Sequence, residues 1–237
     1  MSPTDLENYP RPGVTVDLAA LTVVGVTSPS PQLSVLVQER TDPEPGLALP
    51  GGFMRERWTV DRTVADVLER KVGITVARDI PIRLLRVFDD PDRDERTWAI
   101  SLAHAASLPE NALAGAHGTL VPIGTDGSMP FDEPLLFDHD QIVCAAVESL
   151  RERYEFRHRY ADTLPDPDGF LTEPFTLLQL RRVHESVIAQ KLHKDNFARR
   201  MSNYLEPVLH DNGDPVLAEN LRGRPAALYR RATTTPT

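Results

Sequence analysis

The sequence contains a single cysteine, Cys144, so no disulfide can form within the chain, and this residue is expected to pack on a helix face. Its seven histidines follow no metal-binding spacing, which argues against a structural zinc site. It has no internal repeats and no apolar signal segment at its beginning, and its longest apolar stretch, Leu18 to Val26, is too short and too polar to span a membrane. These absences predict a cytoplasmic protein.

The net charge of −9 is unfavourable for contact with nucleic acid if it is taken over the whole chain, but the charge is unevenly distributed between two parts. From Phe175 to Arg231 there are ten Lys or Arg and six Asp or Glu residues, a net +4. The remainder has sixteen and twenty-nine, a net −13, and the two parts together give −9. A nucleic-acid surface would therefore be confined to the C-terminal part, although +4 is also an ordinary surface charge. The length of 237 residues leaves room for two such parts.

Residues 49–74 form the most informative segment, with Leu-Pro-Gly-Gly-Phe at its start and Gly-Ile at its end. The frame resembles the Nudix box, which has a Gly, a Glu six residues later, and then Arg-Glu-apolar-any-Glu-Glu-any-Gly-apolar. Counted from Gly52, the apolar and glycine positions match at Leu68, Gly73 and Ile74. The positions of the box's charged residues hold Trp58, Asp66, Val67, Arg70 and Lys71.

Two cations thus stand where the box has its Glu-Glu pair. Magnesium is a hard cation held by carboxylate and phosphate oxygens, and exchanging two carboxylates for Arg70 and Lys71 changes the local charge by about four units. Metal-assisted hydrolysis is therefore not expected, and the sequence predicts no catalytic residue, no metal and no cofactor. The alternative is that the frame has no functional meaning, because Gly-Gly before an amphipathic helix is common in α/β proteins.

The residues around the box predict its surroundings. Runs rich in β-branched residues, at 14–18, 33–37, 83–88 and 98–103, favour strands, so the order is strand, strand, helix, strand, strand, as in the Nudix α/β/α sandwich. Residues 141–156 have a helical apolar pattern, and residues 163–174 contain three prolines and a glycine, typical of a linker or loop. We expect a boundary near residue 150, with domains at 1–150 and 151–237.

The C-terminal part has the pattern of a helix-turn-helix. Thr176 can cap a helix whose apolar residues recur at helical spacing from Leu177 to Ile188. After a polar break, a second helix carries Phe197 and Met201 on one face and basic residues on the other. Val208 to Tyr229 would then form two short strands around a polar loop, a wing suited to a duplex backbone or minor groove.

Several short sequences resemble the NrtR family in order along the chain. They are Arg11-Pro12, Leu49 to Phe53, Phe88 with Pro91 to Asp94, Phe175 to Leu177, Asn196 to Arg200, and Gly223 to Arg230. In this bacterial family a Nudix-like domain recognises ADP-ribose or a relative, and a winged helix-turn-helix binds operators of NAD metabolism genes. The resemblance implies an α/β (α+β) Nudix-like sandwich followed by a C-terminal winged helix-turn-helix domain. It also implies a homodimeric repressor whose partners are double-stranded operator DNA and a nucleotide effector.

The resemblance and the charges together indicate two sets of binding residues. The ligand-binding candidates are Arg11, Phe53, Arg55, Arg70, Lys71, Phe88, Arg93, Asp94 and Arg96. The DNA-binding candidates are Thr176, Lys191, Lys194, Asn196, Arg199, Arg200, Arg222, Arg224 and Arg230.

The sharpest hypothesis is that Arg70 and Lys71, with Arg55, hold a pyrophosphate as fixed counter-charges. The simpler alternative is that these side chains face solvent. For the whole chain, two other functions stay open. One is a nucleotide-diphosphate hydrolase that uses carboxylates such as Glu56, Asp61 or Glu69. The other is a DNA-binding protein whose Nudix-like half only dimerises.

Overall fold

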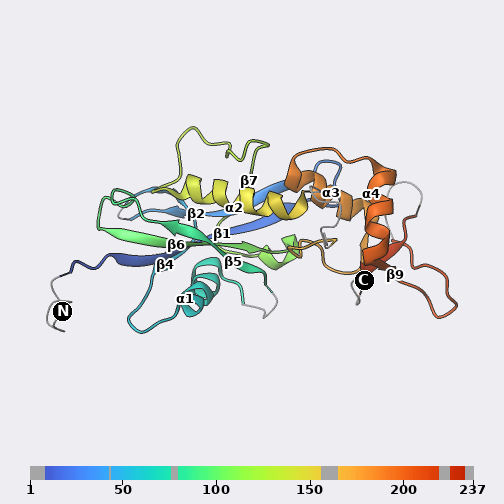
Figure 1. Ribbon diagram of the computed structural model, residues 1–237, viewed down its shortest axis with the longest axis horizontal. Coiled ribbons are helices and arrows are strands. Elements are labelled where there is room, and N and C mark those ends of the chain that lie inside the picture. Colours follow the sequence, from blue (N-terminus) through green and yellow to red (C-terminus); the bar gives the residue numbers. More distant parts are fainter. Residues whose placement is uncertain (1–8, 43, 76–79, 156–164, 219–224, 233–237) are drawn as a thin grey trace.

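The computed structural model describes residues 9–42, 44–75, 80–155, 165–218 and 225–232. The molecule is elongated, with a sheet-based domain and a smaller domain built from α3, α4 and short strands at one end (Figure 1). No helix in the described part of the chain is long and apolar enough to cross a membrane.

The large domain is built on a mixed seven-stranded sheet. Its strands are β1 (Gly13–Val24), β2 (Gln32–Arg40), β3 (Gly46–Ala48), β4 (Gly51–Phe53), β5 (Ile82–Phe88), β6 (Ala99–Ser107) and β7 (Thr119–Pro122). The main order is β3-β2-β1-β6-β5, with β4 paired to β1 and β7 paired to β2. Only β1 and β6 run parallel, and the other pairs are antiparallel. All four predicted strands are confirmed.

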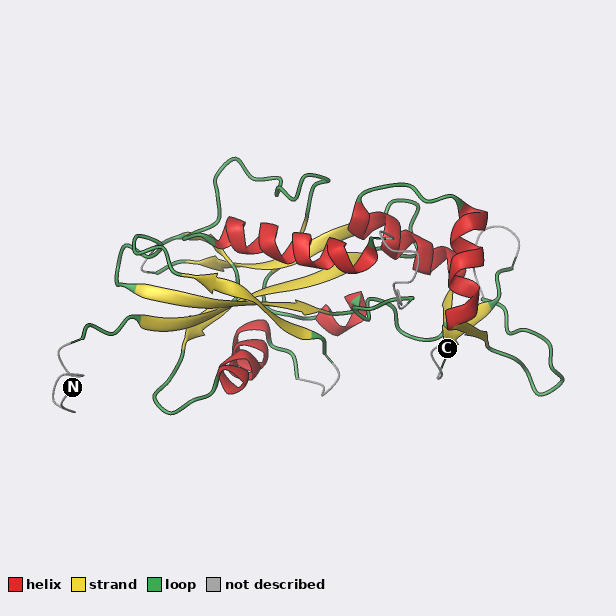
Figure 2. Ribbon diagram, in the orientation of Figure 1, coloured by secondary structure: helices red, strands yellow, loops and turns green. Residues whose placement is uncertain are grey.

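Helices cover both faces of this sheet (Figure 2). On one face lie α1 (Val60–Asp66) and the π-helical turn η2 (Val67–Val72), and on the other lies α2 (His139–Tyr154). Side chains of a strand alternate between its faces, so Leu18 of β1 packs in the cluster with Leu68, whereas Leu21 packs in the cluster with Ile142. A short 3-10 helix, η3 (Glu110–Leu113), follows β6. The predicted α/β/α sandwich is confirmed.

The small domain contains β8 (Phe175–Thr176), α3 (Leu177–Ile188), α4 (Lys194–Met201), η4 (Ser202–Tyr204), β9 (Leu205–Pro207) and β10 (Leu228–Arg231). The strands form a three-stranded antiparallel sheet in the order β8-β10-β9. Thr176 caps α3 in a complete capping box with Gln179. Helix, break, helix and hairpin thus form the predicted winged helix-turn-helix.

The junction between the domains is tightly packed. Tyr154, at the end of α2, lies edge-on to His184 of α3 at 4.8 Å between ring centroids, and His184 lies in the same way against Phe197 of α4 at 5.0 Å. The loop before β8, expected to be a linker, buries Asp166 and Asp168 in its described part. Residue 150 lies inside α2, so the division at 1–150 and 151–237 stays a prediction.

Candidate ligand cavity and nucleic-acid surface

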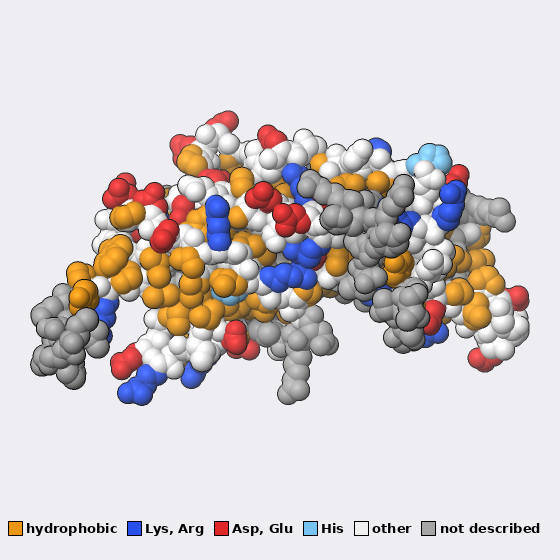
Figure 3. All heavy atoms as spheres, viewed as in Figure 1, with side chains coloured by type: hydrophobic (Ala, Val, Ile, Leu, Met, Phe, Trp, Pro, Cys, Tyr) orange, Lys and Arg blue, Asp and Glu red, His pale blue; other side chains and the backbone are white. Residues whose placement is uncertain are grey.

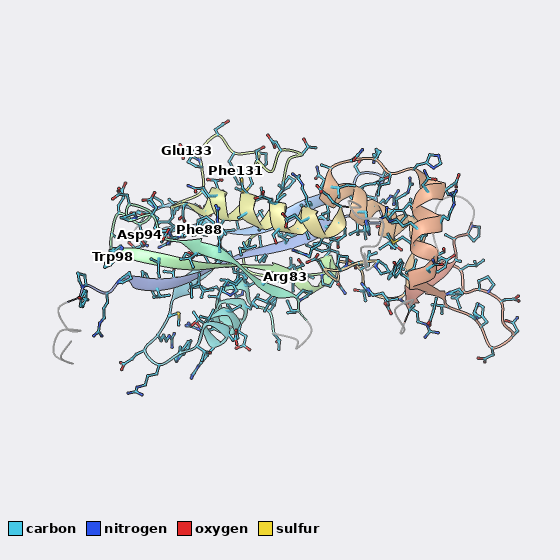
Figure 4. All side chains as sticks on the ribbon, in the orientation of Figure 1. Arg83, Phe88, Asp94, Trp98, Phe131 and Glu133 are labelled. Carbon is cyan, nitrogen blue, oxygen red and sulfur yellow. The ribbon has the colours of Figure 1, made fainter. Side chains whose placement is uncertain are left out.

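A cavity of about 490 Å³ opens at the end of the sheet that lies away from the small domain. Its walls come from β1, the end of β2, β4, η2, the loop before β6 and the start of α2. The charged residues in its lining are Asp17, Glu39, Arg40, Asp42, Lys71, Arg93, Asp94 and Arg96. Figure 4 shows Asp94 and Trp98 at this end of the sheet and Arg83 toward the other. The volume is in the range of small-molecule sites.

A buried charge network forms the floor of the cavity. The Arg93 guanidinium donates from Nε and Nη2 to the two Asp138 oxygens at 2.8 and 2.6 Å, and Nη2 also lies 3.3 Å from Asp17 Oδ2. His139 Nδ1 accepts a hydrogen bond from the Leu49 N–H at 2.9 Å, which leaves Nε2 to carry the proton, 3.6 Å from Asp17 Oδ1. The network therefore joins β1, the loop before β6 and the start of α2 to the residue that begins Leu-Pro-Gly-Gly-Phe.

Asp17 is ionised in this setting. Burial by itself would raise the pKa of its carboxyl group, but the His139 ring and the Arg93 guanidinium favour the charged form and bring this pKa well below its usual value. Because its oxygens are engaged by these fixed donors, Asp17 organises the cavity floor and is not a free base.

Gly51 is required by the close approach of β4 to β1. A Cβ atom at residue 51 would lie 2.1 Å from Asp17 Oδ1 and 2.9 Å from the Val16 carbonyl oxygen, whereas a Cβ atom at Gly52 would meet nothing within 4 Å. The two adjacent glycines of the box frame thus have different roles. Only the first is needed for packing.

We expect Gly51→Ala to lower the free energy of unfolding by about 2 kcal/mol, because the new methyl group must displace the Asp17 carboxylate or the β1 backbone. Gly52→Ala is the matched control and should change stability by less than about 0.5 kcal/mol. Urea denaturation of both variants measures the difference. Equal stabilities would contradict the packing role of Gly51.

The structure brings five of the nine ligand-binding candidates together in the cavity lining: Phe53, Lys71, Arg93, Asp94 and Arg96. Phe88 lies beside it, in the wall of a neighbouring cavity of about 440 Å³ that shares Arg93. Arg11 is exposed before β1, and neither it nor Arg55, which lies over the Trp58 ring at 4.6 Å, lines either cavity.

Arg70 is placed differently from its neighbour Lys71. Its guanidinium forms an exposed, two-pronged ion pair with Asp66 one helical turn earlier, and it lines neither cavity. The box has Arg and Glu at these two positions, so this chain keeps the pair with its charges exchanged. The hydrogen bond with Arg70 lowers the pKa of Asp66. In this structure Arg70 is the partner of Asp66, and its role as a phosphate ligand stays a prediction.

Two other substituted box positions, 58 and 67, hold apolar side chains. Val67 is buried in the core under α1, and Trp58 lies under the guanidinium groups of Arg55 and Arg62. Glu56 and Asp61, possible substitute ligands, are exposed. Among the described residues, no three His, Cys, Asp or Glu side chains come together as a possible metal site.

Sequence reasoning missed five residues that the structure places in this site or its charge network. Asp17 lies on β1, Arg40 ends β2, and Phe137, Asp138 and His139 lead into α2. An aromatic residue followed by Asp-His directly before a predicted helix was the available signal. Its position more than forty residues from the box concealed the contact.

The small domain exposes a polar face of α4. Phe197 and Met201 are buried, whereas Lys194, Asn196, Arg199 and Arg200 are exposed. This arrangement matches a helix that packs on α3 and presents its other face to a duplex.

The remaining DNA-binding candidates differ in their exposure. Lys191 is exposed, 3.3 Å from Glu185, and Arg230 lies on β10, 3.8 Å from Glu206. Thr176 is buried, and its hydroxyl caps α3, so its side chain is corrected from a DNA contact to a core residue. Arg222 and Arg224 lie outside the described residues.

Known proteins resemble the chain over both domains. A family model, the NrtR DNA-binding winged helix domain, matches residues 169–231. The crystal structure of Shewanella oneidensis NrtR is 27% identical with a TM-score of 0.69, over 94% of this chain and 95% of that one. The same protein in complex with a 27mer DNA is 26% identical with a TM-score of 0.70, over 92% and 93%. This chain belongs to the NrtR family.

Its N-terminal half has a Nudix relative of its own. A MutT/Nudix family protein from Listeria innocua is 30% identical to this NrtR-family chain, with a TM-score of 0.51, and the match covers 98% of that protein and 61% of this chain. No curated protein is similar enough to count as a match. The NrtR family thus accounts for both domains: a Nudix domain and a winged helix domain of the NrtR DNA-binding type.

Proposed function

We propose that this NrtR-family protein is a ligand-responsive transcriptional regulator that represses NAD metabolism genes and senses ADP-ribose or a related nucleotide without hydrolysing it. One observation carries the proposal: a single helix, α2, contacts both the cavity and the DNA-binding domain. A ligand that contacts α2 differently in two arrangements of the domains changes the affinity for DNA.

The two ends of α2 contact different parts of the molecule. At its start, Asp138 and His139 belong to the charge network of the cavity floor. At its end, the Arg151 Nε donates to the Val187 carbonyl oxygen of α3 at 3.0 Å, and Tyr154 contacts His184. Because the helix is continuous over residues 139–154, a displacement at its start is transmitted to α3. Because α4 packs on α3, a displacement of α3 also moves α4.

The proposed ligand is a nucleotide diphosphate because the cavity belongs to a Nudix fold and contains cations where an anionic ligand needs them. Lys71 replaces a carboxylate of the box and lines the cavity. A fixed cation offsets phosphate charge in place of a divalent metal, so the site favours binding over turnover. The family resemblance of the sequence implies ADP-ribose or a relative as this ligand.

The proposed DNA-binding form is a homodimer. Hydrophobic side chains gather on one face of the large domain, over β4, β5 and β6 (Figure 3). Leu84 and Val87 on the edge strand β5 and Trp98 before β6 are exposed by 57%, 45% and 46%. A patch of this kind favours association with a second copy. Two copies would present two α4 helices to a palindromic operator.

The test is a gel-shift titration of DNA from upstream of the protein's own gene, with and without ADP-ribose. We expect a retarded band whose midpoint shifts about tenfold when ADP-ribose is added. The double variant Lys194→Ala/Arg199→Ala should weaken binding about tenfold and lower the slope of log affinity against log salt by about two, because two phosphate contacts are lost.

Controls separate the parts of this proposal. Arg62→Ala removes a cation remote from the DNA face and should leave the shift unchanged. Release of phosphate products from ADP-ribose with magnesium would show a hydrolase instead of a sensor. An unretarded duplex at moderate salt would overturn the regulatory function as a whole.

A further inference from the structure

Phe137 contacts two arginines in the lining of the cavity. The guanidinium carbon of Arg40 is 5.2 Å from the centroid of its ring, and that of Arg96 is 4.9 Å from it. The three residues come from the end of β2, the loop before β6 and the segment before α2. Guanidinium groups and purine bases are both planar and both stack on aromatic faces. Phe137 is therefore a platform that a base can occupy in place of a guanidinium.

The two arginines differ in how they are held. Arg96 donates from Nε and Nη2 to the two oxygens of Asp94 at 2.8 and 2.7 Å, which fixes its position. In the described part of the chain, Arg40 has no ion pair, and its contact with the Phe137 ring is the interaction that holds its guanidinium. Arg40 is thus the arginine that an incoming base can displace.

The ion pairs in the cavity also single out Arg40. Arg93 is neutralised by Asp17 and Asp138, and Arg96 by Asp94. Of the four cations in the lining, Arg40 and Lys71 alone lack a carboxylate partner among the described residues. These two cations are available to a diphosphate.

Phe137 also has a strained backbone, with φ at 63°. Bulky residues rarely adopt this left-handed conformation, which is strained for them. This backbone conformation places the ring in the lining of both cavities, which share Phe137 and Arg93. The ring is half-buried, so part of its surface is open to a ligand.

We propose that Phe137 and Arg40 form the base-and-phosphate clamp of this site. The aromatic base of a nucleotide diphosphate stacks on Phe137 and displaces Arg40, whose guanidinium then pairs with the diphosphate together with Lys71. The clamp deepens the proposed function and rests on it. In this clamp the ligand contacts Phe137, the residue directly before Asp138 and α2.

Calorimetric titration of the full chain with two probes tests the clamp: ADP-ribose, and ribose 5-phosphate, which has no base. Phe137→Leu keeps an apolar side chain and removes the aromatic face, so it should weaken ADP-ribose about tenfold and leave ribose 5-phosphate unchanged. Arg40→Ala removes the cation that the base displaces onto the diphosphate, so it should weaken ADP-ribose and leave ribose 5-phosphate, which has no base to displace it, nearly unchanged.

Two matched controls belong to the same titrations. Phe131→Leu changes another aromatic residue of the segment between β7 and α2, one that lines neither cavity. Arg62→Ala removes a guanidinium that also lies over an aromatic ring, that of Trp58, outside both cavities. Both variants should bind the probes as the unaltered chain does, and thermal denaturation shows that all four variants are folded.

The outcomes separate the clamp from the proposed function. If the unaltered chain binds neither probe, the proposed ligand class fails and the clamp fails with it. If it binds ADP-ribose and the Phe137 and Arg40 variants bind equally well, the clamp alone is overturned. An equal loss of both probes in Phe137→Leu also overturns base stacking, because it shows that the ring only positions the segment.

Discussion

Replacing Asp168 with alanine is expected to lower the free energy of unfolding by about 4 kcal/mol, because it leaves two partly buried guanidinium groups without their common partner. The Asp168 side chain has no exposed surface and accepts hydrogen bonds from Arg83 at 2.6 Å, from Arg153 at 2.9 and 2.8 Å, and from Ser107 at 2.9 Å. These partners belong to β5, α2 and β6, and Asp168 lies on the loop before the winged helix domain. The variant therefore weakens the attachment between the domains.

Chemical denaturation monitored by circular dichroism measures this loss. Asp168→Asn keeps the shape of the side chain and one acceptor oxygen, so it should lose less than the alanine variant. Asp92→Ala, in the exposed loop before β6, is the control and should change stability by about 0.5 kcal/mol or less. A loss in Asp168→Ala no greater than in Asp92→Ala would show that the ion pairs do not stabilise the junction.

The second large effect is on the pH dependence of stability. Desolvation in the contact between α2, α3 and α4 lowers the pKa of His184 from 6.5 to about 4. Between these two values the unfolded chain binds a proton that the folded chain does not, so stability falls as pH falls. We expect the free energy of unfolding to drop by about 3 kcal/mol from pH 7 to pH 4 through this residue.

Urea titrations at a series of pH values measure this slope. His184→Phe keeps a ring between Tyr154 and Phe197 but cannot be protonated, so its stability should fall less over the same range. Asp17 acts in a different range: its pKa is lowered from 3.8, so its contribution is lost only at more acidic pH. Parallel pH profiles for the two chains would show that His184 does not control the acid sensitivity of the junction.

The sequence predicted the elements well wherever local patterns are strong. Thr176 forms the expected helix cap, and the run at 14–18 lies in a strand as expected. The helix-turn-helix followed from apolar spacing and basic faces. These features depend on neighbours within a few residues, which is why they are visible in the sequence.

The cavity could be predicted only in part. Arg70 and Lys71 are adjacent in the sequence, and their charges suggested one common role. On a helical turn, adjacent side chains point in different directions, so Lys71 lines the cavity whereas Arg70 pairs with Asp66. The four-residue spacing of Asp66 and Arg70 was a signal for their pairing. Which side chain lines the cavity depends on how η2 packs against the sheet.

The sequence by itself determined that this chain combines a Nudix frame without its carboxylates and a basic helix-turn-helix, since both are written in local residue types and spacings. The tertiary structure alone decided which cations line the cavity. Arg40 and Phe137 are far apart along the chain, and only the strand order and the docking of α2 bring them together at one cavity. The physical reason is that chain patterns encode local conformation, whereas a binding site depends on contacts between distant segments that packing creates.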